Sequence, residues 1–153
     1  MKHKKIILIS LCLVILITLI IILSTKNKKT YNNLTCTKEE EIVNGKENTT
    51  YIVKYDNDKV NKVEYIKKYY GKTNKEKENI NTLCALVQEE AKMYKEKNGF
   101  DYKLNRKTSN ECKITYYFDM TNIDEELLDI FNIKSKYQDM KDYFDSKDEY
   151  TCK

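Results

Sequence analysis

Five cysteines are the residues of this 153-residue chain whose chemistry follows most directly from their spacing. Cys12 lies inside a hydrophobic run, and the other four stand beyond it at positions 36, 84, 112 and 152. The chain has no C-x-x-C redox pair and no zinc half-site, and its only histidine is His3. An even number of widely spaced cysteines in a small domain predicts two disulfides and an oxidising compartment.

Four cysteines permit three pairings, and the sequence pattern favours one of them. Cys84 falls in an apolar stripe at helical spacing, and Cys112 falls in an alternating set typical of a core-facing strand. A Cys84–Cys112 bond would therefore join a helix to a sheet. Cys36 and Cys152 would remain, and their bond would close almost the whole domain. A bond between Cys36 and Cys84 stays open as an alternative.

No other group of residues predicts metal binding or catalysis. Asp56-Asn57-Asp58 resembles the start of a calcium loop, but Val60 and Lys67 stand where that loop needs an oxygen ligand and a glutamate. A hairpin turn is the better interpretation of this segment. The serines beyond the hydrophobic run have no histidine to act as their base. We therefore expect no enzyme, metal or cofactor, and we keep a hydrolase with paired carboxylates as the rival hypothesis.

Thirteen tyrosines and no tryptophan are the other notable feature of the composition. Tyrosine suits a half-buried sheet, where its ring packs and its hydroxyl stays wet. Alternatively, some tyrosines form an exposed recognition surface, the candidates being Tyr65, Tyr69, Tyr70, Tyr116 and Tyr117.

The hydrophobic run at residues 6–24 contains no charged residue and follows the basic leader Lys2-His3-Lys4-Lys5. A helix of this length is about 28 Å long, close to the roughly 30 Å thickness of a bilayer's hydrocarbon core. Ile22-Leu23-Ser24 lacks the small residues of a signal-peptidase site, and the bulky Leu11 precedes Cys12 where a lipobox needs a small residue. We therefore expect a retained anchor, with cleavage as the alternative.

The orientation of the anchor depends on the cysteines. Three lysines precede the hydrophobic run and three follow it before residue 30, so the flanking charges tie. Disulfides form outside the cytoplasm, so the part of the chain that follows the hydrophobic run is expected to be extracytoplasmic. This predicts a single-pass cell-membrane protein with a cytoplasmic N-terminus. From residue 30 onward, the chain contains 22 basic and 24 acidic residues. This net charge of −2 argues against nucleic-acid binding.

The periodicity of the remaining chain predicts an α+β domain. Residues 34–69 read as a three-stranded meander with turns at Asn44-Gly45 and residues 56–58. A long amphipathic helix follows, with a capping box at Thr73 and Glu76 and a stop at Asn98-Gly99. Its apolar stripe consists of Ile80, Leu83, Cys84, Val87, Ala91 and Tyr94.

Residues 100–118 predict a hairpin turning through residues 107–110, and the tail predicts short helices capped at Asn122 and Ser135. The sheet is therefore expected to be antiparallel, a meander plus a hairpin, with the long helix packed on it. The predicted organisation is a cytoplasmic leader at residues 1–5, a transmembrane helix at 6–24, a stalk at 25–33 and an extracytoplasmic domain at 34–153.

Several short segments carry a resemblance to a known family: Leu34-Thr35-Cys36-Thr37, residues 51–55, residues 58–63 and Tyr150-Thr151-Cys152-Lys153. The chain resembles small membrane-anchored extracytoplasmic proteins of low-GC Gram-positive bacteria and is similar to the YehR-like lipoproteins. The resemblance implies an α+β sheet-and-helix fold and a Cys36–Cys152 bond, and it supplies no catalytic residues. The chain departs from the lipoproteins because it lacks a lipobox.

These observations predict a non-enzymatic, membrane-anchored envelope protein with a disulfide-stabilised extracytoplasmic domain. Its partner is expected to be another envelope protein or a small ligand, besides the membrane that holds residues 6–24. The rival hypotheses are an anchored hydrolase with paired carboxylates and an accessory subunit of a membrane complex.

Overall fold

The computed structural model describes residues 30–43, 45–108 and 110–153. The predicted leader and anchor at residues 1–24 lie outside these ranges, as does residue Asn44 of the first predicted turn. Within the described ranges, no helix has the length and apolar character needed to cross a membrane. Residues Tyr31–Lys153 form one compact unit.

The first half of the unit consists of three strands and a long helix, β1 (Asn32–Ile42), β2 (Gly45–Asp56), β3 (Lys59–Tyr70) and α2 (Asn74–Met93). The second half contains β4 (Phe100–Thr108), β5 (Glu111–Asp119), α3 (Glu125–Ile130), α4 (Tyr137–Asp145) and β6 (Thr151–Cys152). All strand pairs are antiparallel, in the order β4-β5-β3-β2-β1-β6. The predicted α+β class, meander and hairpin are thus confirmed.

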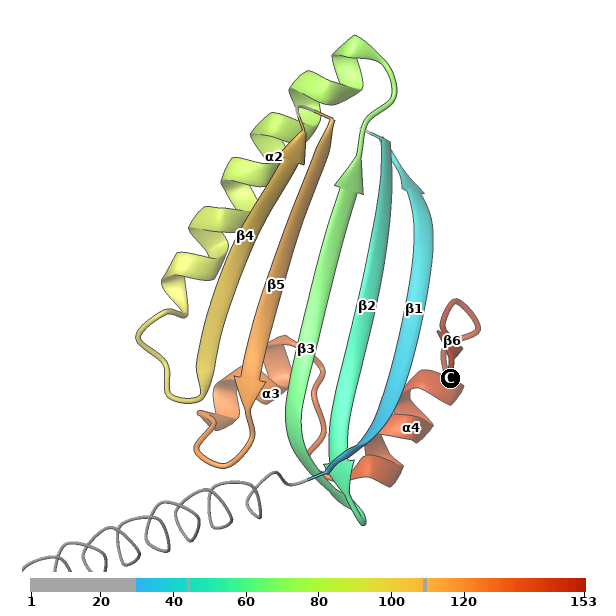
Figure 1. Ribbon diagram of the computed structural model, residues 1–153, viewed down its shortest axis with the longest axis vertical. Coiled ribbons are helices and arrows are strands. Elements are labelled where there is room, and N and C mark those ends of the chain that lie inside the picture. Colours follow the sequence, from blue (N-terminus) through green and yellow to red (C-terminus); the bar gives the residue numbers. More distant parts are fainter. Residues whose placement is uncertain (1–29, 44, 109) are drawn as a thin grey trace, which may run out of the picture. The chain divides into compact units, whose positions relative to one another are not determined.

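The three helices lie on one face of the sheet, and the other face carries none of them (Figure 1). α2 runs along β4 and β5, whereas α3 and α4 lie toward the end of the sheet where β2 turns into β3 (Figure 1). The core fills the space between the sheet and the helices, and α2 contributes four buried residues to it, Ile80, Cys84, Val87 and Ala91. These residues belong to the predicted apolar stripe.

Two turns of the meander depend on residues that adopt a positive φ. Asn57, with φ of 54°, connects β2 to β3 at the predicted second turn. Gly45 begins β2 with φ of 129°, and a Cβ at this position would stand 1.9 Å from the carbonyl oxygen of Tyr70. Glycine is therefore required there for backbone conformation and for space.

α2 begins as predicted and ends earlier than predicted. The Thr73 hydroxyl accepts from the Glu76 amide at 3.2 Å, and the Glu76 carboxylate accepts from the Thr73 amide at 2.7 Å, which completes the capping box. The helix ends at Met93, and turns occupy the residues up to the predicted stop. Gly99, with φ of 71°, instead leads the chain into β4.

The predicted caps of the two short helices are wrong. α3 has Asp124 as its N-cap and α4 has Lys136, and neither side chain caps its helix. The first amides of α4 are satisfied from the β2–β3 turn instead. Tyr137 donates to the carbonyl of Asp58 at 2.8 Å, and Gln138 donates to the Asp58 carboxylate at 3.0 Å. A residue distant in the sequence thus performs the capping role expected of Ser135.

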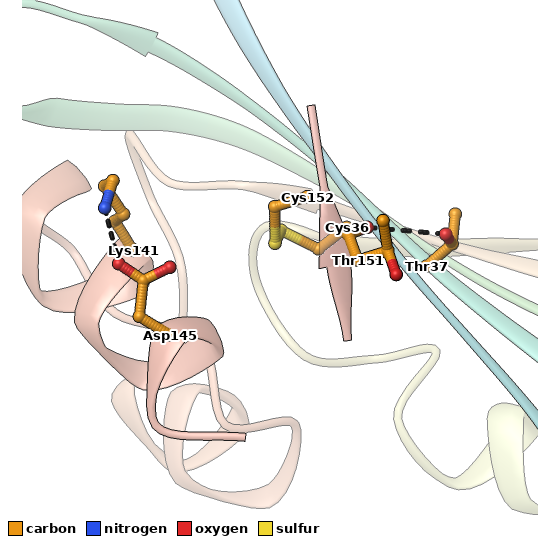
Figure 2. The surroundings of a disulfide bond; sticks show 6 residues. All are labelled: Cys36, Thr37, Lys141, Asp145, Thr151 and Cys152. Carbon is orange, nitrogen blue, oxygen red and sulfur yellow. Dashed lines mark hydrogen bonds and ion pairs between the residues drawn. A yellow bond between two sulfur atoms is a disulfide. The ribbon is translucent and has the colours of Figure 1, made fainter. Parts of the chain in front are cut away.

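Two disulfides join the same pairs that the sequence favoured. Cys84–Cys112 connects α2 to β5, and Cys36–Cys152 connects β1 to β6. Cys36 and Cys152 are direct partners in the ladder, where the Thr37 hydroxyl donates to the Thr151 carbonyl at 3.4 Å (Figure 2). β6 is too short to produce a periodic pattern, and sequence reasoning therefore missed it.

The first prediction concerns the Cys36–Cys152 bond. Its partners are 116 residues apart, and the chain-entropy model assigns roughly 5 kcal/mol to closing so long a loop. Replacing both residues by alanine should lower the free energy of unfolding by up to that amount and detach β6. Hydrogen exchange should accelerate at the amides of Thr35 and Lys153, which pair at 3.0 and 2.9 Å. The matched C84A/C112A variant should leave these two amides protected, and equal acceleration in both variants would contradict the assignment.

The second prediction concerns the cap of α4. Asp58→Ala should lower the free energy of unfolding by about 1 kcal/mol, as the loss of an N-cap does, because the Gln138 amide loses its acceptor. Ser135→Ala is the matched control and should leave stability within the error of a urea titration. A larger loss in the Ser135 variant would show that the local cap operates in solution.

Candidate functional site

One row of directly paired residues crosses the whole sheet on the face that carries the helices. It starts on β4 and ends on β6, and its members are Tyr102, Tyr116, Tyr65, Tyr51, Cys36 and Cys152. Four tyrosines on four neighbouring strands are thus followed by the Cys36–Cys152 disulfide. The next row toward the β2–β3 turn is apolar and contains Leu34, Val53, Val63, Phe118 and Phe100.

The tyrosines of this row pack against one another. The ring centroids of Tyr51 and Tyr65 are 4.6 Å apart, and those of Tyr65 and Tyr116 are 5.5 Å apart. Phe131, the residue after α3, packs against Tyr65 and Tyr116 at 5.9 and 5.4 Å. Such offset and edge contacts between rings stabilise a sheet beyond the area they bury. The rings therefore form a fixed floor.

A pocket of about 170 Å³ opens over this floor, and we call it the tyrosine pocket. Three strands and two helical segments supply its lining, which consists of Tyr51, Tyr65, Lys67, Glu90, Tyr116, Ile130, Phe131 and Asn132. Glu90 comes from α2, and the last three residues come from the end of α3 and the turn that follows it. The pocket thus lies where the packing of α2 meets that of α3.

The far wall of the pocket is held to its floor by a buried hydrogen bond. The Tyr51 hydroxyl donates to the carbonyl of Phe131 at 3.3 Å. Asn132 follows with φ of 52°, a conformation that asparagine tolerates better than most residues. The Ile133 amide then donates to the Leu128 carbonyl at 2.8 Å, which closes the end of α3. The wall is positioned by backbone geometry, and the exposed Asn132 side chain lines the pocket.

The charged and polar groups at the pocket differ in whether they have an ion-pair or hydrogen-bond partner. Lys67 forms an ion pair with Glu47 at 3.2 Å, and Glu47 also accepts from the Thr49 hydroxyl at 3.0 Å. Among the described residues, no ion pair or hydrogen bond engages the Glu90 carboxylate or the side-chain amide of Asn132, whereas the Asn132 backbone amide donates to the Asp129 carbonyl at 3.3 Å. The cation on the floor is therefore already neutralised, while the two polar groups from the helical segments remain available.

Burial raises the pKa values of Tyr51, Tyr65 and Tyr116 well above the usual range, and nearby acidic groups add to the effect at Tyr65 and Tyr116. These hydroxyls are therefore protonated and serve as hydrogen-bond donors at any physiological pH. Burial alone would lower the pKa of Lys67, but Tyr69 and Glu47 outweigh it and raise that pKa. Lys67 therefore stays charged.

Part of this site could be identified from the sequence. Of the five tyrosines considered as a recognition surface, only Tyr65 and Tyr116 line the pocket. Tyr69 is buried, and Tyr117 is on the strand face opposite to Tyr116. Tyr51, Lys67, Glu90 and Asn132 were missed, because they come together only through strand register and helix packing. The alternating pattern showed which residues share a strand face with Tyr51 and which share one with Tyr65. It did not show that both tyrosines lie on the same face of the sheet.

The lining of the pocket can be compared with the carboxylate pair that the rival hydrolase requires. Glu90 is the one carboxylate among the described residues that line the pocket, whereas glycoside hydrolysis uses two. The four disulfide cysteines are bonded in pairs and supply no thiol nucleophile. The unit is thus a disulfide-stabilised α+β domain whose helices pack on one sheet face and leave a small polar pocket between them.

A solved structure shares this fold. The NMR structure of a protein from Streptococcus pneumoniae TIGR4 matches with a TM-score of 0.54 and 13% identity, over 83% of this chain and 87% of that one. The NMR structure of E. coli YehR has a TM-score of 0.49 and 17% identity, over 69% of this chain and 73% of that one. No family model and no curated protein matches the chain. The likeness to the streptococcal protein concerns the fold alone.

The third prediction concerns the buried tyrosines. Unfolded tyrosines ionise near pH 10, whereas burial raises the pKa values of Tyr51, Tyr65 and Tyr116 in the folded state. The folded state therefore retains protons that the unfolded state releases, so the free energy of unfolding should fall as the pH rises above about 10. Ultraviolet absorbance should show these tyrosines ionising together with the loss of near-ultraviolet circular dichroism.

The control for this titration is the protein in urea, where all thirteen tyrosines should titrate in one step. Tyr65→Phe should remove one tyrosine from the late, cooperative step and leave the early step unchanged. Complete ionisation near pH 10 with the fold intact would show that the hydroxyls are accessible to solvent and that the pocket floor is wrong.

Proposed function

We propose that this chain is a membrane-anchored envelope protein whose extracytoplasmic domain binds a small polar ligand in the tyrosine pocket, and that it is not an enzyme. The anchoring and the orientation rest on the hydrophobic run at residues 6–24 and on the four cysteines that follow it. The two disulfides agree with an oxidising environment outside the cytoplasm.

The observation that carries the proposal is the contrast between the floor and the rim of the pocket. The floor is rigid, because directly paired strands fix its rings and the Tyr51 hydroxyl is bonded to the opposite wall. The rim offers the Glu90 carboxylate and the Asn132 side-chain amide, and neither has a hydrogen-bond or ion-pair partner among the described residues. Polar groups fixed in a concave site with unused hydrogen-bonding capacity are the features that recognise a small molecule.

The rival hydrolase finds less support. Its second carboxylate would have to be Glu47, which is held in an ion pair with Lys67 at 3.2 Å and is only 13% exposed. A general acid needs a raised pKa and access to the scissile bond. Glu47 is not part of the pocket lining, whereas Lys67, its ion-pair partner, is.

The fourth prediction is that the pocket binds at least one class of small polar molecule. The full-length protein in lipid nanodiscs, with tyrosine rings labelled, would be titrated with glucose, glycine, choline chloride and inorganic phosphate. Because Tyr65 and Tyr116 line the pocket, a bound molecule should shift their ring signals in NMR spectra. Tyr117, which is on the opposite face, is the internal control. If none of the four probes shifts Tyr65 or Tyr116 at tens of millimolar, the binding role is wrong.

A further inference from the structure

We infer that the tyrosine pocket takes a neutral, polyhydroxylated ring, which means a single sugar unit either free or at the end of a glycan. The inference rests on the proposed binding function and adds the chemical class of the ligand. It follows from the charge of the pocket, from the polarity of its lining, from the placement of its donors and acceptors, and from its size.

Charge argues against an anionic ligand. Lys67 is paired with Glu47, so its positive charge is compensated before any ligand arrives. Glu90 adds a carboxylate that nothing among the described residues neutralises. An anion in the pocket would therefore meet a net negative charge in a partly enclosed site, where repulsion is stronger than in water.

A cationic ligand meets the opposite difficulty. Aromatic rings together with a carboxylate often bind ammonium groups, but here the Lys67 ammonium already lies 5.8 Å from the centre of the Tyr65 ring. A second cation over this floor would lie beside a charged lysine, whose pKa is raised so that it stays protonated. The pocket therefore favours neither an anionic nor a cationic ligand.

The lining suits a ligand that both donates and accepts hydrogen bonds. Polar atoms dominate the accessible lining, so an apolar ligand would leave several of them unpaired. Glu90 accepts hydrogen bonds, Lys67 and the Tyr65 hydroxyl donate them, and the Asn132 side chain does both. The Tyr51 hydroxyl already donates its proton to the Phe131 carbonyl. Neighbouring hydroxyls of a sugar ring can bond to such a set in both directions without bringing a charge.

Size limits the ligand to about one ring. The pocket volume of about 170 Å³ lies below the roughly 300 to 1,000 Å³ of sites for drug-sized molecules. The exposed side chain of Ile130, 42% accessible, gives the rim one apolar surface against which a ring face can pack. One sugar unit would fill this space, and any continuation of a glycan would extend into solvent.

The fifth prediction tests this ligand class with variants of the rim. The full-length protein would again be studied in lipid nanodiscs, because many detergents carry sugar or choline head groups. Glucose should shift the Tyr65 and Tyr116 ring signals with saturable, millimolar affinity, and cyclohexanol, a ring with one hydroxyl, should not. Glu90→Ala should weaken glucose binding roughly tenfold, as the loss of a charge-assisted hydrogen bond does. Asn132→Gly, which tolerates the positive φ, should weaken it severalfold.

Glu78→Ala is the matched control, because Glu78 is an exposed glutamate on the same helix and is not part of the pocket lining. It should leave glucose affinity unchanged. Salt separates the classes further, since the affinity for a neutral sugar should stay constant as ionic strength rises, whereas that for an ion should change.

The outcomes distinguish this inference from the function on which it rests. Shifts of Tyr65 and Tyr116 by choline or phosphate, with no response to glucose, would overturn the sugar assignment and leave the binding function standing. Glucose shifts that persist unchanged in the Glu90 and Asn132 variants would place the sugar elsewhere and also overturn it. No response to any probe would overturn both.

Discussion

The register of the antiparallel sheet is the constraint on which the rest of this domain depends. Side chains alternate between the two faces of a strand, so a slip of one residue between β2 and β3 would move Tyr65 to the opposite face from Tyr51. The floor of the pocket, the apolar row beneath the helices and the alignment of Cys36 with Cys152 all require the same register. The turn at Asn57 and the register shift between Lys54 and Tyr55 together set it at one end of β2, and the crowded Gly45 sets it at the other.

On β1, β2 and β3, successive rows of the helix-bearing face change from apolar to polar, whereas β5 continues with the buried Ile114, the partner of Lys67. The row of Val53, Val63 and Phe118 is buried, the next row consists of tyrosines, and the row after that contains Thr49 and Lys67. Tyrosine suits the intermediate position because its ring packs on the apolar side while its hydroxyl reaches the polar side. The pocket forms at this transition, where the sheet extends beyond the part that α3 covers and a fully apolar surface would have no partner.

Local patterns and long-range contacts differ in how far they could be predicted from the sequence. Turn residues, alternation and the Thr73–Glu76 capping box each act within a few residues, so the meander, the long helix and the hairpin followed from them. The Cys84–Cys112 pair followed from two such patterns combined. The pocket did not, because Glu90 and Asn132 are remote in the sequence and exposed, and exposed polar residues carry no periodic signal. The cap that Asp58 supplies to α4 could not be predicted either, because Asp58 and Gln138 are also far apart in the sequence.

The wall of the pocket is therefore a product of tertiary structure. Asp124 at the start of α3 accepts hydrogen bonds from the backbone and side-chain amides of Asn98, at 3.0 and 3.1 Å, and Asp58 caps α4. Both helices are short, and isolated helices of this length are unstable in water. Their stability therefore depends on the groups that the sheet and its turns offer, and the Cys36–Cys152 bond fixes the chain beyond them. The wall of the pocket therefore depends on the sheet register, because the groups that support α3 and α4 come from turns and loops that the sheet positions.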